Sequence, residues 1–310
     1  FIDSPVIDLL VNEKGEANYM VMKPTDEVED DDKGFDLQID RLEIKNALLR
    51  YCDEAGNLYF SAVNFDYLGS GNMSEAVFQL KSKIRIHSFD FSFDNVFYVK
   101  EKPILADLET LIDTKSLTFE FQKNNLKIKD LLVSFIGRFG FIENGYDMLF
   151  DINTEQASLN ELLSLVPPEY QSWLDQTKFE GVVDGKFKLE GKFLALDTIM
   201  PSINLDLAIA NGVIQHGNVM DPIKDLALKF QFKMPSLDME QSEILIDQLD
   251  FSIAGRKSNF TLHTKGFEKP IVQSAMDLNM DLDLIQQALG VTGFDLKGDL
   301  QLKGNVDGQF

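Results

Sequence analysis

Apolar and polar residues alternate with a period of two along most of this chain. The apolar positions of six such stretches are Phe35, Leu37 and Ile39; Phe89, Phe91 and Phe93; Leu117, Phe119 and Phe121; Ile203, Leu205, Leu207 and Ile209; Leu226, Leu228, Phe230, Phe232 and Met234; and Leu278, Met280 and Leu282. Because successive side chains of a strand point to opposite faces, each stretch has one apolar and one polar face. One-sided burial is typical of antiparallel sheets. The pattern therefore predicts a mostly β protein with an elongated, twisted antiparallel sheet.

Two short stretches depart from the alternation and have helical spacing. Ser158-Leu-Asn-Glu161 is a capping-box sequence, after which leucines fall on one helical face until Pro167-Pro168. The second helix is predicted over Leu284–Leu289, with Asp283 as its N-cap and Gly290 as its end. Both helices are amphipathic and are expected to lie on the apolar face of the sheet.

Between the two helices, the turn from Pro168 to Leu174 presents two large aromatic side chains, Tyr170 and Trp173. They suit either a lid or a plug in the core.

Several sequence landmarks recur in the same order more than a hundred residues later. The matching pairs are Ile128–Gly137 with Ile246–Gly255, Asp151–Asn153 with Asp277–Asn279, Gly185–Gly191 with Gly298–Gly304 and, more weakly, Asn46-Ala-Leu-Leu with Asn211-Gly-Val-Ile. Recurrence at a fixed order predicts a duplicated structural unit. We expect an N-terminal segment with an acidic loop over 1–34, a first β repeat unit over 35–194 and a second over 195–310, each unit with one short helix.

The charge of the chain restricts its partners. Asp and Glu number 51 against 29 Lys and Arg, which gives a formal net charge of −22. Nucleic acids and anionic membrane surfaces bind through clustered Lys and Arg, so neither is expected as a partner. Cys52 is the single cysteine, which rules out a disulfide within the chain.

No group of residues has the spacing of a metal, cofactor or catalytic site. His87, His216 and His263 lie in separate strand contexts, and the acidic run Asp26–Asp32 and the stretch Asp277–Asp283 both lack the central glycine of a calcium loop. Phosphate-binding loops and nucleophile elbows are also missing. The sequence predicts a protein that is not an enzyme, with no metal and no cofactor.

The chain has no apolar run of the roughly 18 residues needed to cross a bilayer and no signal peptide. It begins at Phe1 and ends within the strand-like pattern at Gly308-Gln-Phe310. We expect it to be a piece of a longer protein.

The apolar face of the expected sheet is long, and the chain contains 25 Phe residues. An ordinary closed core is one interpretation of this excess. The other is a curved sheet, only partly covered by its short helices, that leaves a groove for acyl chains. The candidate lining residues are Phe119, Phe121, Phe187, Leu189, Phe230, Phe232, Leu300 and Leu302.

Three segments resemble the AsmA-like family of bacterial envelope proteins. They are Phe35–Tyr51 with its Arg41-Leu-Glu-Ile-Lys-Asn-Ala core, the Gly-x-Phe-x-Leu-x-Gly repeats, and the opening Asp3-Ser-Pro-Val-Ile-Asp-Leu-Leu followed by Gly15-Glu-Ala-Asn18. The chain departs from the family at Tyr19, where Trp is common, and lacks the N-terminal membrane helix.

The resemblance implies a periplasmic protein, anchored to the inner membrane outside this segment, that takes part in outer-membrane biogenesis. The family is similar to bridge-like lipid transporters built from repeated β-grooves. Phospholipid, or another acyl-chain lipid, is the implied partner, together with other envelope proteins. The alternative function is that of an exported structural or protein-binding β module with a closed core.

Overall fold

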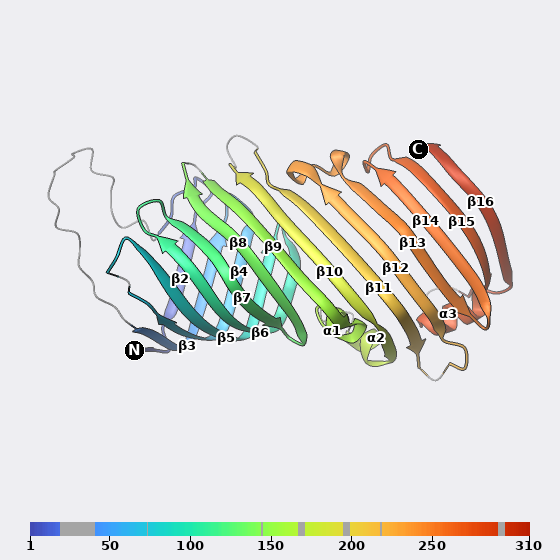
Figure 1. The fold of residues 1–310 in the computed structure, drawn as a ribbon, viewed down its shortest axis with the longest axis horizontal. Helices are drawn as coiled ribbons and strands as arrows, with labels where there is room; N and C mark the ends of the chain where they lie inside the picture. The colour runs from blue at the N-terminus through green and yellow to red at the C-terminus, as the bar shows by residue number, and fades with distance from the viewer. Residues whose placement is uncertain are drawn as a thin grey trace. The chain divides into compact units, whose positions relative to one another are not determined.

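The computed structural model describes residues 1–18, 41–72, 74–143, 145–166, 171–194, 199–217, 219–290 and 295–310 (Figure 1). The expected acidic loop at Asp26–Asp32, the alternation at Phe35–Ile39 and Tyr170 lie outside these residues. The described chain is mostly β with a few short helices, as the alternation predicts. It divides into two compact units, the first made of residues 1–129 and 135–141, the second of residues 130–134 and 142–310.

The first unit is a sheet of long strands without helices among its described residues. Its strands are β1 (Ile2–Asp3), β2 (Val6–Val11), β3 (Arg41–Asp53), β4 (Leu58–Ser70), β5 (Val77–Phe93), β6 (Val96–Asp113) and β7 (Thr118–Ile128). β1 and β2 pair parallel with β3, and β3 to β7 pair antiparallel in chain order. β8 (Leu131–Ile142) contributes residues to both units.

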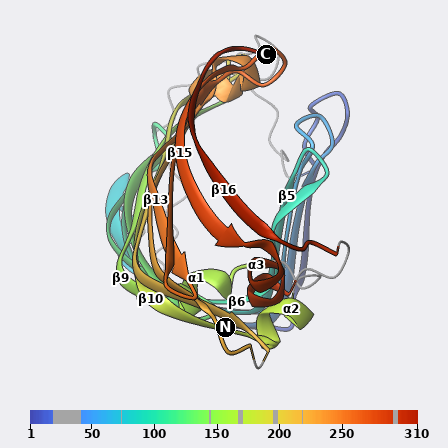
Figure 2. The ribbon, with the colours of Figure 1, turned by 90° about the vertical axis from the view of Figure 1, so that its right-hand side faces the viewer.

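The second unit contains all the described α-helices. Its elements are β9 (Gly145–Ser158), α1 (Leu159–Leu163), α2 (Gln171–Asp175), β10 (Thr177–Phe193), β11 (Ser202–His216), β12 (Ile223–Met234), η3 (Pro235–Leu237), η4 (Met239–Gln241), β13 (Glu243–Ile253), β14 (Arg256–Lys265), β15 (Ile271–Asp281), α3 (Leu282–Leu289) and β16 (Asp299–Gln309). β9 to β16 pair antiparallel in chain order. The strands of this unit curve, and α1 and α3 lie on the inner side of the curve (Figure 2).

A strand–helix–strand arrangement occurs twice in the second unit. α1 and α2 connect the paired strands β9 and β10, and α3 connects the paired strands β15 and β16. The recurring sequences Asp151–Asn153 and Asp277–Asn279 lie in β9 and β15, the strands that precede α1 and α3, which is the arrangement expected of a duplicated sequence. The segments of the longest match differ in structure: Ile128–Gly137 crosses the β7–β8 turn, whereas Ile246–Gly255 follows β13 into its closing turn.

The helix boundaries follow from their capping residues. The predicted capping box of α1 is confirmed: the Ser158 hydroxyl accepts a bond from the Glu161 N–H, and the Glu161 carboxylate accepts one from the Ser158 N–H. Gly290, with φ +64°, ends α3 as predicted. The predicted N-cap at Asp283 is wrong, because Asp281 holds that position and accepts bonds from the N–H groups of Asp283 and Leu284.

The weak match between Asn46 and Asn211 marks a recurring bulge. Both residues have positive φ, 51° and 54°, and both lie where the strand register shifts. The Asn46 N–H donates to the Asp66 carboxylate at 3.0 Å, and at the bulge of β9 the Gln156 N–H donates to Asp184 at 2.8 Å. Bulges bend and twist a strand, so these bonds hold bends within the long strands.

Candidate functional site

The backbone register aligns apolar side chains in a row that crosses the second unit perpendicular to its strands. Residues directly opposite each other in an antiparallel pair lie on the same face of the sheet. Successive pairs connect the residues of this central row, which are Ile152, Phe187, Leu205, Phe232, Ile244, Thr264 and Val272. Six strand spacings of about 4.8 Å give the row a length of about 29 Å. Thr264 is its one polar member.

Two further rows lie beside the central row on the same face. Toward one end of the strands are Phe150, Leu189, Ile203 and Met234, and toward the other are Leu207, Phe230, Ile246 and Leu262. We call these two rows and the central row together the apolar face. Rows on one face of a strand are two residues apart, so the three rows span about 13 Å along the strands.

The side chains of the apolar face are partly exposed, and none is buried. In contrast, side chains beneath the helices are closed off from solvent: Phe179 is 5%, Val183 0% and Ile253 1% exposed. Among the described residues, no member of the central row belongs to a helix-covered cluster. Neighbouring side chains on the same face of the sheet account for the partial burial of the central row, and no second layer is needed to explain it.

The helices cover only one end of this face. α1 and α2 pack on Phe179 and Val183 of β10, and Leu207 lies at the edge of that cluster. α3 packs through Ala288 on Ile223, Ile253 and Met280. The two recurring helices therefore close the same strand end, and the central row lies beyond them.

Trp173 joins the two helix clusters. Its indole Nε1–H donates to the Leu289 carbonyl at the end of α3 at 2.7 Å, and its ring contacts Phe179 and stacks on His216. The Thr177 hydroxyl bonds to both the Trp173 carbonyl and His216 Nδ1, each at 2.7 Å. Of the two roles expected for Trp173, lid or plug, these contacts correspond to a plug in the core.

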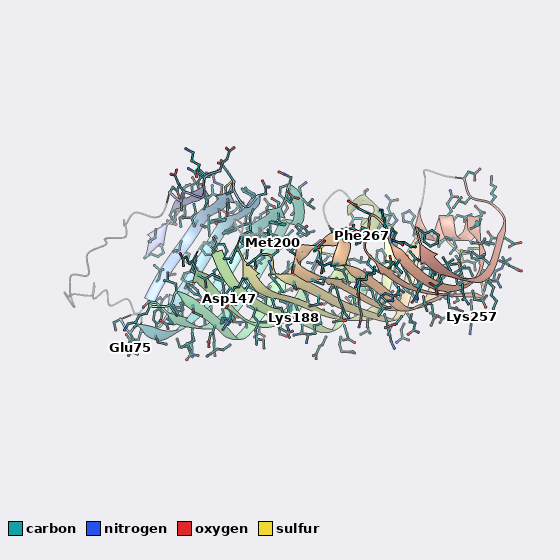
Figure 3. All side chains as sticks on the ribbon, turned by 90° about the horizontal axis from the view of Figure 1, so that it is seen from above. Glu75, Asp147, Lys188, Met200, Lys257 and Phe267 are labelled. Atoms are coloured by element: carbon teal, nitrogen blue, oxygen red, sulfur yellow. The ribbon has the colours of Figure 1, made fainter. Side chains whose placement is uncertain are left out.

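The opposite face of the second unit is polar. It contains Lys186, which forms an ion pair with Asp151 at 3.2 Å, and Lys188, labelled in Figure 3, which pairs with Glu190 at 2.6 Å. A shallow depression of 350 Å³ on this side is lined by charged groups that include Asp206 and Lys229. Exposed ion pairs of this kind contribute little to stability, and their main effect is to keep this face hydrated.

The described residues hold no group of three or more His, Cys, Asp or Glu side chains that could bind a metal ion. His87 and His263 are exposed, and His216 is in the Trp173 contact described above. Cys52 is a free, half-buried cysteine on β3.

The structure brings four of the predicted lining residues together: Phe187, Leu189, Phe230 and Phe232 all lie on the apolar face. Leu300 packs against the α3 cluster, so it contributes to the helix-covered core. Leu302, on β16, pairs with Leu278 and is 45% exposed.

The remaining two predicted residues belong to the first unit. Phe119 and Phe121 lie on β7. The centre of the Phe119 ring is 6.3 Å from that of Phe141, and the centre of the Phe121 ring is 5.6 Å from that of Phe135. They therefore do not form part of the apolar face of the second unit.

Sequence reasoning did not select the other five residues of the central row, which are Ile152, Leu205, Ile244, Thr264 and Val272. Leu205 lies in a stretch of clear alternation, so the sequence assigns it to the apolar face of its strand. The sequence could not predict that Leu205 lies opposite Phe187 and Phe232, because strand register depends on turns and bulges, which alternation does not reveal.

Among the described residues, no helix has the length and apolar character needed to span a bilayer. A scan against protein-family models, a search of curated proteins and a search of solved structures each found no match for this chain. The AsmA-like resemblance thus stays a prediction from the motifs quoted above.

Proposed function

We propose that this chain binds an acyl-chain lipid, most simply a phospholipid, along the apolar face of its second unit. The observation that carries the proposal is the central row, about 29 Å of nearly continuous apolar side chains that no described helix covers. Half of a bilayer's hydrocarbon core is about 15 Å thick. The row is therefore long enough for a lipid tail laid across the strands.

The energetics of such binding are those of partitioning. Complete burial of a methylene group is worth about 0.8 kcal/mol, so ten methylenes with one side on the protein would contribute about 4 kcal/mol. The side chains of the apolar face bury a comparable apolar area when the lipid binds. The conformational entropy that the lipid loses offsets part of this favourable free energy. The expected result is reversible binding without a covalent step, which allows a lipid to be released or moved along the row.

The AsmA-like resemblance supports a setting for this activity. In that setting the chain projects into the periplasm of a diderm bacterium, tethered to the inner membrane by a segment outside the sequence described here. Its task would be to conduct phospholipid between membranes for assembly of the outer membrane.

The alternative is an exported structural or protein-binding module whose apolar face is closed. That function requires a second layer over residues such as Leu205 and Phe232. Their partial exposure favours the open face, and the two functions differ in whether phospholipid accompanies the purified protein.

Native mass spectrometry with lipid extraction tests the proposal. We expect phospholipid to copurify with the wild-type chain and to be lost from Phe232→Asp, which places a charge in the central row. Gln231→Asp is the matched control, because it adds the same charge on the same strand but on the opposite face. Thermal unfolding of both variants checks that they fold. A lipid-free wild-type protein that also ignores added fluorescent phospholipid would contradict the proposal.

A further inference from the structure

A second exposed apolar surface lies in the first unit, at the tip of the hairpin formed by β5 and β6. The two strands are joined by a two-residue turn, Asp94–Asn95, in which both residues have positive φ (48° and 62°). This is the backbone pattern of a type I′ turn, which matches the twist of the flanking strands. The tip is therefore held in a defined conformation by its own backbone.

Three consecutive apolar side chains follow the turn and are all exposed. Val96 is 54%, Phe97 45% and Tyr98 59% accessible to solvent. Neighbouring residues of a strand point to opposite faces, so the tip is apolar on both sides. A single exposed apolar residue is ordinary, but three in succession that include two aromatic rings form a patch typical of interaction sites.

The tip also extends past its neighbouring strand. In the described residues, pairing between β6 and β7 starts at Ile104 opposite Ile128, so Val96–Glu101 has no β7 partner. The Tyr98 ring lies beside Phe91 of its own hairpin, with 6.2 Å between the two ring centres. Lys100 places its ammonium group 5.6 Å from the centre of the Phe97 ring.

We propose that the Val96–Tyr98 tip inserts into the headgroup region of a lipid bilayer. Its chemistry matches that zone: Tyr and other aromatic rings gather at membrane interfaces, and a Lys beside them reaches the phosphates. The unpaired backbone edge sets the depth, because unsatisfied N–H and C=O groups do not enter hydrocarbon but remain hydrated among headgroups. This inference rests on the proposed lipid binding, since a protein that takes lipid from a bilayer must contact one.

The charges near the tip select the kind of bilayer. Asp94 and Glu101 flank the three apolar residues and offset Lys100, and the whole chain carries a net charge of −22. An anionic surface would repel the protein. The tip therefore suits a bilayer of zwitterionic lipid, and its binding is expected to weaken as anionic lipid is added.

Cosedimentation with phosphatidylcholine vesicles tests the inference on the full chain. We expect wild type to sediment and Phe97→Ser/Tyr98→Ser to bind about tenfold more weakly, since each lost aromatic contact removes apolar burial in the interface. Val77→Ser is the control: Val77 is 47% exposed at the other end of the same strand pair, opposite Asp113. Unchanged sedimentation of the double variant, or no sedimentation of wild type, would overturn the proposal.

A fluorescent label at the turn gives an independent readout. In a Cys52→Ser background, an environment-sensitive dye on Asn95→Cys is expected to shift to the blue with phosphatidylcholine vesicles and to shift less with vesicles that contain anionic phosphatidylglycerol. If neither kind of vesicle shifts the emission of the dye to the blue, the result contradicts insertion. Uptake of detergent-dispersed phospholipid by the Phe97→Ser/Tyr98→Ser variant separates the two proposals: retained uptake with lost sedimentation assigns the defect to the tip and leaves the apolar face intact.

Discussion

Two phenylalanines of the second unit should respond very differently to truncation if its apolar face is open. Phe179 is 5% exposed beneath α1 and α2, with its ring 5.4 Å from that of Trp173. Phe232 lies in the central row and is only partly buried, by its neighbours on adjacent strands. Both belong to the same compact unit, so both substitutions report on the unfolding of the same structure.

The structure sets the size of each effect. Phe179→Ala removes a ring from an enclosed cluster and leaves a cavity, which costs about 3–5 kcal/mol in the free energy of unfolding. Phe232→Ala leaves no enclosed cavity, because its site is open to solvent. It loses only part of the transfer free energy of the ring, about 1–1.5 kcal/mol.

Urea unfolding followed by circular dichroism measures the difference. With unchanged slopes, the shifts in midpoint give the two free energies directly. We expect the loss for Phe179→Ala to exceed that for Phe232→Ala by a factor of two or more. Equal losses of 3 kcal/mol or more would show that the central row is enclosed, and would refute the reasoning that assigns it to an open face.

Two further predictions concern Gly290 and the ion pair between Glu243 and Lys265. Gly290→Ala should destabilise the chain by more than Gly15→Ala: both positions have positive φ (64° and 79°), which costs an alanine about 1 kcal/mol, but only at Gly290 would the new Cβ meet the His216 ring. Urea midpoints of the two variants measure this, and equal losses would contradict the clash. The Glu243 carboxylate accepts a bond from the Lys265 ammonium at 3.0 Å, which lowers the pKa of Glu243 below its usual 4.5. Its contribution is therefore present above about pH 4.5 and lost as the pH falls through the lowered pKa, so the stability advantage of wild type over Glu243→Gln should shrink in acid; an advantage independent of pH would contradict the pairing.

The alternation of apolar and polar residues predicted strands where the structure has β5, β11 and β12, but Leu282, which continues the alternation of Leu278 and Met280, begins α3. The stretch from Leu226 to Met234 lies within β12 (Ile223–Met234), and its apolar positions all share one face, as a period of two requires. The capping box at Ser158 located α1 for the same kind of reason, because its two reciprocal bonds are local and their residue types are distinctive.

The rest depended on interactions that are distant in sequence. Asp281 and Asp283 are both acceptable N-caps, and the choice between them follows from where β15 stops pairing with β16, at Asp281 opposite Asp299. Leu300 has the same local pattern as Leu302, yet it packs against α3 while Leu302 is exposed. Alternation assigns a residue to a face of the sheet, but only the tertiary register decides whether a helix covers it.

Site-specific quenching by lipid tests the central claim most directly. In a Cys52→Ser background, a fluorophore is attached to Leu205→Cys, in the middle of the central row, or to Asp206→Cys, the next residue on the same strand and on the opposite face. Phospholipid with brominated tails is then added. We expect strong quenching at position 205 and little at position 206. Equal quenching at both positions, or none at either, would contradict a lipid-binding apolar face.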